Sequence, residues 1–170
     1  MVEFKAVRFL VLDVDGVLTD GSIIVDDLGI EAKRFHVRDG FAITAAQKVG
    51  LKIGVLTGRN TRAVNLRTLE LHIGHVLQGA TDKGAGLAEL CEKAGVGLEQ
   101  TAFMGDDLLD LPAMRRCGFP IAVADAVDEV RQVACFVTAA RGGRGAVREA
   151  IEHILEAQGL WRQIVDSYMQ

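Results

Sequence analysis

The stretch FLVLDVDGVLTDG, residues 9–21, runs an almost unbroken apolar sequence into two aspartates. Short apolar runs of this kind are typical of buried strands. Asp13 and Asp15 stand one residue apart where such a strand would end, so their negative charges would repel each other. Gly16 follows and allows the chain to turn sharply. The pair therefore indicates a cation between the carboxylates and chemistry beside it.

The composition indicates a folded, globular chain. Of the 170 residues, 49% are hydrophobic and 25% are charged, which distinguishes the protein from a disordered one. This length suits one core, and we expect residues 1–170 to form a single domain without a separate cap domain. The formal net charge of -4 gives no general attraction to nucleic acid, so no nucleic-acid partner is expected.

The chain shows no targeting or membrane segment. Its start, MVEFKAVRF, lacks the pattern of a secretory signal, and no apolar run reaches the length of a membrane span. Cys91, Cys117 and Cys135 are odd in number and lack metal-binding spacing, so we expect reduced thiols. The four histidines show no ligand spacing either. These features predict a cytoplasmic protein without membrane contact.

Apolar runs alternate with helical patterns along the chain. We expect strands at RFLVLD, KIGVLTG, HVLQG, TAFMGDD and GFPIAVAD, and helices over 40–49, 61–71, 84–94, 107–116 and 144–157. Strands that alternate with helices predict a doubly wound α/β fold, in which a parallel sheet is covered on both faces.

One insertion interrupts this alternation. Residues 21–40, GSIIVDDLGIEAKRFHVRDG, contain two β-prone runs around DDLG and predict a β-hairpin before the first helix. The hairpin is either an ornament of the sheet edge or a flap beside a site. Its place directly after the aspartate pair favours the flap, because ligands of open α/β sheets bind beyond the carboxyl ends of the strands.

Polar residues follow three further predicted strands. They are Thr57, Gly58 and Arg59 in LTGR, Lys83 in TDKG, and Asp106, Asp107 and Asp110 in GDDLLD. Each alone fits a simpler role, and Asp39 and Asp107 in particular fit helix caps. Because the carboxyl ends of parallel strands share one rim of the sheet, we expect the residues after those strands to converge.

This set of side chains suits phosphoryl transfer to a carboxylate. Aspartate oxygens are the hard ligands that Mg²⁺ prefers, and the ion would offset the repulsion between an anionic nucleophile and a phosphate. Thr57 and nearby backbone N–H groups can hold phosphate oxygens, while Lys83 can neutralise negative charge. The sequence therefore predicts phosphoryl transfer to an aspartate with the help of Mg²⁺.

The motifs DxDGVLTDG, LTGR, TDKG and GDDxxD resemble, in order, the four motifs of the haloacid dehalogenase superfamily. The resemblance covers the whole chain and implies a Rossmann-like fold. It implies Asp13 as the nucleophile that forms an aspartyl-phosphate, and Asp15 as the acid and base. It further implies Mg²⁺ held by Asp13, the backbone carbonyl of Asp15, and Asp106, with Asp107 and Asp110 as further ligands or as supports of the ligands.

Sequence segments beyond the catalytic motifs resemble those of one branch of the superfamily. FHVRDGFAI, GDDLLDLPAM and GGRGAVRE are similar to segments of small phosphatases that act on an eight-carbon keto-acid sugar phosphate in lipopolysaccharide sugar synthesis. Phosphatases of nine-carbon keto-acid sugars share these segments, so they are an alternative. A broad small-metabolite phosphatase or a phosphotransferase is a further alternative. A noncatalytic assembly module is the alternative from a different class, although the intact motifs argue against it.

A sugar acid with a phosphate and a carboxylate needs cationic partners. Arg59, Arg38 and Arg144 are candidates for substrate binding, because a planar guanidinium group can hold a carboxylate in a bidentate manner. Arg62 and Arg141 fit the role of exposed surface residues. The glycine-rich loop before the last long helix either presents N–H groups to an anion or serves as a flexible connector.

Two apolar segments predict a homo-oligomer. The hairpin residues Ile23, Ile24, Val25, Ile30 and Phe35 would leave an apolar edge open if the hairpin stood alone. The tail, residues 159–170, carries an apolar stripe that packs by default on its own domain, with a neighbouring subunit as the alternative. The resemblance implies a tetramer in which hairpins associate and neighbouring chains complete each site. The segment around Trp161 is a further candidate for regulating access.

Overall fold

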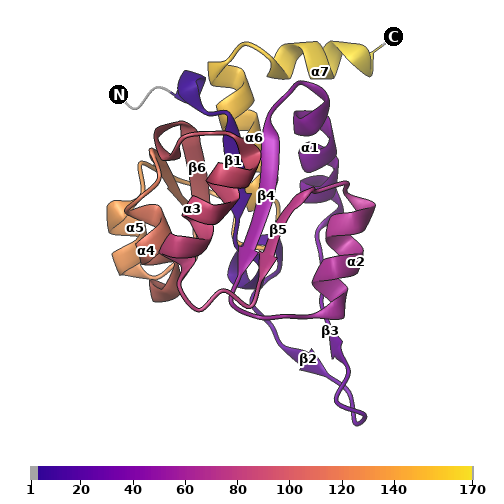
Figure 1. Cartoon of the computed structure of the whole chain (residues 1–170). Helices are drawn as coiled ribbons and strands as arrows, with labels where there is room; N and C mark the ends of the chain where they lie inside the picture. The colour runs from indigo at the N-terminus through magenta and orange to yellow at the C-terminus, as the bar shows by residue number, and fades with distance from the viewer. Residues whose placement is uncertain (1–3, 170) are drawn as a thin grey trace.

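In the computed structural model, which describes residues 4–169, six parallel strands form one sheet flanked by helices (Figure 1). The strands are β1 (Phe9–Leu12), β4 (Lys52–Thr57), β5 (His75–Gln78), β6 (Thr101–Gly105), β7 (Phe119–Ala122) and β8 (Phe136–Val137). Their order in the sheet is β5-β4-β1-β6-β7-β8. The expected doubly wound α/β fold is confirmed.

Helices cover both faces of this sheet. They are α1 (Val37–Lys48), α2 (Arg62–Glu70), α3 (Lys83–Ala94), α4 (Leu111–Met114), α5 (Asp128–Val133), α6 (Ala146–Ala157) and α7 (Trp161–Ser167). Helices α1 and α6 pack against each other, as do α3 and α4. Short helical turns are η1 (Phe4–Ala6), η2 (Val14–Leu18), η3 (Leu98–Gln100) and η4 (Leu108–Asp110). No helix within residues 4–169 is long and apolar enough to cross a membrane.

Strand β1 is the buried centre of the sheet. It pairs with β4 on one side and with β6 on the other, so that Leu12 lies opposite Val55 and Met104. All four of its side chains, in the run FLVL, are fully buried. Burial of an aliphatic or phenyl side chain stabilises a fold by about 1.5–3 kcal/mol, so the position at which β1 ends is strongly specified. Asp13 is the next residue.

The predicted hairpin is present between η2 and α1. Strands β2 (Ile24–Val25) and β3 (Glu31–Ala32) are antiparallel and only two residues long. The turn is closed by Asp26, whose Oδ1 accepts hydrogen bonds from the N–H groups of Leu28 and Ile30 at 3.0 and 2.8 Å. Figure 1 shows the hairpin projecting away from the rest of the molecule.

Other segments differ from the sequence patterns. Strand β8 and helix α5 have no counterpart among the predicted elements, because two and six residues carry too little periodicity to be recognised. The helix expected over 107–116 is divided into η4 and α4. Pro112 lies in the first turn of α4, where a residue without an N–H group is tolerated.

The C-terminal segment packs on its own chain. Helix α7 contacts α6, its Ile164 is buried, and Arg148 of α6 lies over the rings of Phe41 and Trp161 at 5.6 and 5.3 Å. Figure 1 shows α7 at the end of the molecule opposite the hairpin. The tail therefore does not cover the strand ends of its own chain.

Candidate active site

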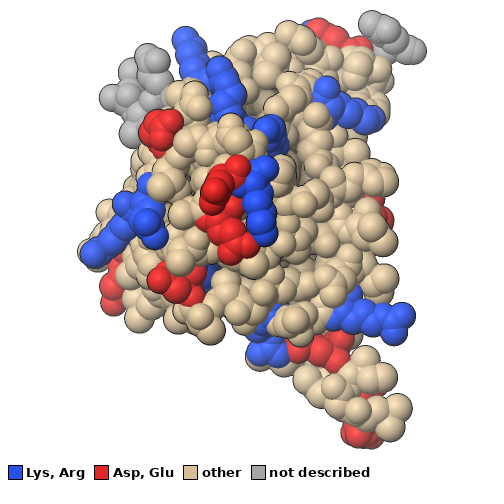
Figure 2. Space-filling view, viewed as in Figure 1, with Lys and Arg blue, Asp and Glu red and all other residues tan. Residues whose placement is uncertain are grey.

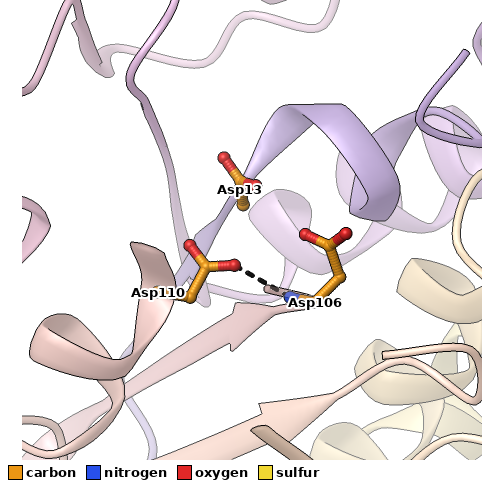
Figure 3. Close-up of side chains that lie close together, drawn as sticks. All are labelled: Asp13, Asp106 and Asp110. Carbon is orange, nitrogen blue, oxygen red and sulfur yellow. Dashed lines mark hydrogen bonds between the residues drawn. The ribbon is translucent and has the colours of Figure 1, made fainter. Parts of the chain in front are cut away.

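The polar residues that follow β1 and β6 meet at the rim of the sheet. From β1 the chain crosses to β4 and β5 on one side and then returns to β6 on the other, so β1 and β6 flank the point where the connections reverse. Ligands of open α/β sheets bind at such a point. One carboxylate oxygen each from Asp13, Asp106 and Asp110 lies within 4.8 Å of the others (Figure 3). We call these three residues the acidic cluster.

Lys83 ties two members of the acidic cluster together. Its Nζ lies 2.8 Å from Oδ1 of Asp13 and 2.5 Å from Oδ1 of Asp110. Lys83 is the first residue of α3, and Asp82 caps this helix by accepting hydrogen bonds from the N–H groups of Gly84 and Ala85. The cap fixes the helix start, so the lysine enters the site from a rigid element.

The cluster carries more negative charge than its surroundings tolerate. Burial, followed by the Asp110 carboxylate, raises the pKa of Asp13 to about 7, although Lys83 acts in the opposite direction. Burial and the carboxylates of Asp13 and Asp110 raise the pKa of Asp106 to about 8. A divalent cation would offset the repulsion between the buried carboxylates, because it stabilises the ionised form of each one. Oxygen donors at this spacing fit a hard cation such as Mg²⁺.

The aspartates after β6 divide their roles. Oδ2 of Asp110 accepts hydrogen bonds from the N–H groups of Asp106 at 2.8 Å and Asp107 at 3.3 Å, which fixes the loop (Figure 3). Asp107 is exposed and caps η4 by accepting from the N–H group of Leu108 at 2.7 Å. The structure therefore gives Asp107 the capping role, while Asp110 supports the loop through one carboxylate oxygen and also belongs to the acidic cluster.

Residues 13–20, which we call the catalytic turn, follow β1 directly. Gly16 has a φ of 91°, and a methyl group at this position would overlap Oδ2 of Asp106. Only glycine allows this backbone conformation and this close approach without strain. The DxDG pattern thus brings the turn directly against the carboxylate supplied by β6.

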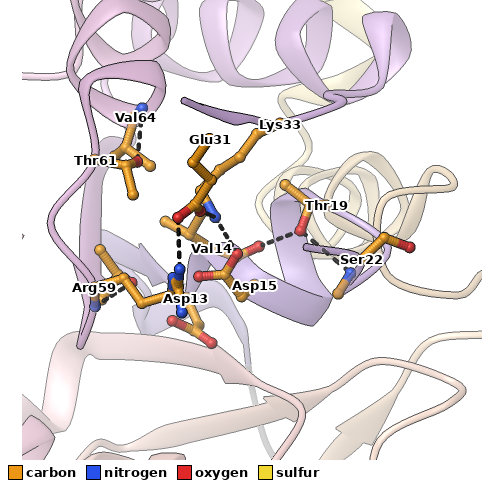
Figure 4. Close-up of polar contacts among 12 residues, drawn as sticks. Asp13, Val14, Asp15, Thr19, Ser22, Glu31, Lys33, Arg59, Thr61 and Val64 are labelled. Atoms are coloured by element: carbon orange, nitrogen blue, oxygen red, sulfur yellow. Dashed lines mark hydrogen bonds and ion pairs between the residues drawn. The ribbon is translucent and has the colours of Figure 1, made fainter. Parts of the chain in front are cut away.

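The hairpin contributes two residues that the sequence analysis did not single out. The buried ammonium group of Lys33 pairs with Asp15 and lies 2.9 Å from Oε1 of Glu31 (Figure 4). Oε2 of Glu31 accepts a hydrogen bond from Nη2 of Arg59 at 2.5 Å. These four residues form one chain of charges across the site. The available signal was the spacing of Glu31 and Lys33, which places both on the same face of a strand.

Glu31, Lys33 and Arg59 of this network favour their charged forms. Hydrogen bonds from Arg59 and Lys33 lower the pKa of Glu31. Burial alone would lower the pKa of Lys33, but hydrogen bonds to Asp15 and Glu31 outweigh it and raise the pKa. The hairpin is thus joined to the catalytic turn by a buried lysine that remains protonated.

Thr57 lies where its motif predicts, at the end of β4. Its side chain is buried, and its hydroxyl accepts a hydrogen bond from the N–H group of Arg59 at 3.3 Å. It does not cap the following helix, because Thr61 does so by accepting from the N–H group of Val64. Gly58 lies between Thr57 and Arg59 and would keep ordinary contact distances if a methyl group were added.

Arg38 and Arg144 lie outside the acidic cluster. With His36 and Arg148 they line a pocket of about 490 Å³ beside the N-termini of α1 and α6. Nη2 of Arg144 lies 3.4 Å from the Asp20 carboxylate. Within residues 4–169, no hydrogen bond or ion pair joins either arginine to the acidic cluster. Arg62 and Arg141 are exposed, as expected.

Asp39 caps a helix, but not the helix that contains it. Its carboxylate is buried, and Oδ1 accepts a hydrogen bond from the N–H group of Arg148 at 2.9 Å, in the first turn of α6. Burial raises the pKa of Asp39. Because this carboxylate accepts from Arg148, that N–H group at the start of α6 is already satisfied within the chain.

Charges of both signs are interspersed on the surface. Figure 2 shows no broad basic area on the viewed face, and basic and acidic side chains meet at the base of the hairpin. This pattern agrees with the hydrogen-bonded charges of the hairpin, and it leaves anion binding to local groups such as those at the strand ends.

Comparisons with known proteins show which family this chain resembles. A family model described as haloacid dehalogenase-like hydrolase matches residues 68–151. The 3-deoxy-D-manno-octulosonate 8-phosphate phosphatase of Escherichia coli strain B is 42% identical over 159 residues, which cover 94% of this chain and 85% of that protein.

Two solved structures extend the similarity to three dimensions. The 3-deoxy-D-manno-octulosonate 8-phosphate phosphatase from Moraxella catarrhalis, in complex with magnesium, phosphate and KDO, has a TM-score of 0.95 and 39% identity, covering 98% of this chain and 95% of that chain. The cobalt-bound phosphatase from Haemophilus influenzae has a TM-score of 0.90 and 41% identity, covering 92% of each chain. The chain therefore belongs to the 3-deoxy-D-manno-octulosonate 8-phosphate phosphatase family of haloacid dehalogenase-like hydrolases.

Proposed function

We propose that this protein is a Mg²⁺-dependent phosphatase that hydrolyses 3-deoxy-D-manno-octulosonate 8-phosphate to the free sugar acid and phosphate, in lipopolysaccharide sugar biosynthesis. One observation carries the proposal. The acidic cluster and Lys83 meet at the switch point of the sheet in a chain that is 42% identical to such a phosphatase. The identity supports the substrate, and the geometry supports the reaction.

The metal seat in this proposal consists of Asp13, Asp106 and the backbone carbonyl of Asp15. The raised pKa values of Asp13 and Asp106 and the 4.8 Å spread of the cluster support it. Bound Mg²⁺ would offset the repulsion between the nucleophile and the phosphate. Asp110 supports this seat by holding the loop and Lys83.

Hydrolysis proceeds in two displacements. A carboxylate oxygen of Asp13 attacks phosphorus, and the bond from phosphorus to the sugar oxygen breaks while Asp15 donates its proton to that oxygen. Asp15 then accepts a proton from water, whose oxygen attacks phosphorus and breaks its bond to Asp13. The products are the free sugar acid and inorganic phosphate, and both aspartates return to their initial states.

The remaining strand-end residues hold the phosphoryl group. The Thr57 hydroxyl and the N–H group of Gly58 bind phosphate oxygens, and Lys83 balances the charge on Asp13 and on the transferring group. Arg59 is the candidate for the sugar acid, since Glu31 already holds its guanidinium group near the site. Arg38 and Arg144 line another pocket, but Arg144 pairs with Asp20 of the catalytic turn, so both stay candidates for binding the sugar acid.

We infer that the enzyme is a cytoplasmic homo-oligomer, specifically a tetramer, built from one domain per chain. Ile23, Ile24, Val25 and Ile30 of the hairpin are between 45% and 61% exposed, which supports burial against neighbouring hairpins. Phe35, expected in the same exposed set, is half buried against the core, and Arg67 lies over its ring at 5.6 Å. It therefore exposes less apolar surface for association than the other four residues.

A substrate panel tests the function. Phosphate release is measured for 3-deoxy-D-manno-octulosonate 8-phosphate, a nine-carbon keto-acid sugar 9-phosphate and glucose 6-phosphate, each with Mg²⁺ and with EDTA. We expect the eight-carbon substrate to have the highest kcat/KM and EDTA to abolish turnover. A higher kcat/KM for the nine-carbon substrate, or equal values for all three, would contradict the assigned substrate. Absence of Mg²⁺-dependent release from every ester would contradict the enzyme.

A further inference from the structure

The loop that connects β8 to α6, residues 138–145, packs directly against the catalytic turn. We call it the closing loop. The N–H group of Gly143 donates a hydrogen bond to the carbonyl oxygen of Val17 at 2.8 Å. A methyl group at Gly142 would overlap the carbonyl oxygen of Gly16, and one at Gly143 would overlap the backbone of Thr19 and Asp20. The contact is backbone against backbone, and it requires glycine at both positions.

The catalytic turn is confined from its other side as well. A methyl group at Gly16 would overlap the Asp106 carboxylate, so this turn has no free space toward β6. The peptide around Gly16 therefore lies between Asp106 and Gly142. Asp15 directly precedes Gly16, so any shift of this peptide also displaces Asp15.

Hydrogen bonds fix the closing loop at two places. Oδ1 of the exposed residue Asp125, which follows β7, accepts from the N–H group of Gly142 at 3.0 Å. The Glu149 carboxylate accepts from the N–H groups of Ala139 and Ala140 at 2.7 and 2.8 Å. The loop is thus a supported element. These hydrogen bonds argue against a flexible connector, one of the two roles predicted from the sequence.

We propose that Gly142 and Gly143 are positioning residues, and that the closing loop sets the position of the catalytic turn and thereby of Asp15. Asp125 supports this arrangement through Gly142. The expected effect on the reaction rests on the proposed function, in which Asp15 protonates the leaving oxygen. The expected effect on the backbone of the catalytic turn does not depend on that function.

The first test separates positioning from a general loss of folded enzyme. The variant Gly142→Ala is compared with Gly74→Ala, because a methyl group at Gly74 meets open space. Both are assayed on the sugar 8-phosphate and on 4-nitrophenyl phosphate, whose leaving group needs little protonation. We expect the kcat ratio of sugar phosphate to aryl phosphate to fall about 10-fold or more in Gly142→Ala only, since misplaced groups cost up to about 100-fold. An equal loss on both substrates would overturn the proposal.

The second test needs neither activity nor a tightly packed variant. Amide hydrogen exchange is followed by mass spectrometry in Asp125→Ala, which removes the partner of the Gly142 N–H group, and in Asp128→Ala as a control at an exposed residue of the neighbouring helix. We expect amides of residues 14–20 to exchange about 10-fold faster in Asp125→Ala than in the wild type. Unchanged exchange there overturns the positioning role. A wild type that releases no phosphate contradicts the proposed function instead, and exchange still decides this proposal.

Discussion

The acidic cluster and the hairpin lie close together, yet they are built in opposite ways. Asp13 is only 5% exposed and follows a fully buried strand, whereas Ile23 is 60% exposed and belongs to a hairpin with two-residue strands. The first region is held by the sheet. The second has few contacts of its own beyond its turn and the charges at its base.

This difference separates two requirements of the proposed chemistry. Reacting groups need fixed positions, which strand ends provide because the sheet specifies where each strand stops. Enclosure of a substrate needs a surface above those groups, and the hairpin cannot bury its own apolar side chains to become rigid. Lys33 is the link between the regions, since it belongs to the hairpin segment but pairs with Asp15.

The largest effect is expected at the rigid region. Asp13→Asn should lower kcat by about 10⁴-fold or more, because an amide is a poor nucleophile and loss of a nucleophile in other enzymes has effects of this size. The fold should survive, since the side chain is isosteric. Steady-state phosphate release and circular dichroism check both points. Retained turnover in the purified variant would remove Asp13 from the mechanism.

Substitution of Lys33, which links the two regions, should have the next largest effect on activity. Lys33→Met removes the cation beside Asp15 and Glu31, and we expect kcat/KM to fall by about 100-fold, as for other displaced active-site groups. Lys33→Arg should recover part of the loss, because it keeps the charge. Lys93→Met, at an exposed lysine paired with Glu89, is the control. Equal kcat/KM in Lys33→Met and the wild type would show that the hairpin does not contribute to the site.

A charge on the exposed apolar surface of the hairpin should change the oligomeric state and lower the activity to a smaller extent. Ile23→Asp should dissociate the oligomer, because a charge would then face the neighbouring hairpin, and kcat/KM should fall roughly 10-fold as the site opens. Light scattering gives the molar mass of the wild type and the variant. Leu69→Asp, at a 73% exposed position of α2, is the control and should not change the mass. A monomeric, fully active wild type would refute the expected assembly.

The smallest effect concerns the stability of the metal-free protein. Burial and the neighbouring carboxylates raise the pKa of Asp106 from 3.8 to about 8. A carboxyl group with a raised pKa stabilises the fold most below its unfolded pKa, and this contribution is lost as the pH rises through the folded value. In EDTA, Asp106→Asn should therefore melt several degrees above the wild type near pH 9, and by a clearly smaller margin near pH 5.

Thermal melts with and without Mg²⁺ check this expectation. Mg²⁺ should stabilise the wild type more at the higher pH and should have little effect on Asp106→Asn, because one anionic ligand is missing. Asp128→Asn, at an exposed residue, is the control. A wild type whose melting temperature in EDTA does not fall relative to Asp106→Asn between the two pH values would contradict the raised pKa.

Much of the architecture could be predicted because it depends on contiguous residues. The apolar runs of β1, β4 and β6 specify three buried strands, and the residues after them are then carried to one rim of the sheet. β8 and α5 escaped recognition because they are short. The hairpin was recognisable from its turn sequence, but the spacing of Glu31 and Lys33 did not by itself connect them to the site.

The sequence by itself determined the doubly wound sheet, the hairpin and the meeting of Asp13, Asp106 and Lys83, because strand periodicity and strand ends are local properties. Only the tertiary structure decided the contacts that do not follow from the ends of the predicted strands. It placed Lys33 against Asp15, Asp39 at the start of α6, and Gly142 against Gly16. Each of these contacts joins residues from different elements, and its geometry depends on how the assembled helices and loops pack around the sheet.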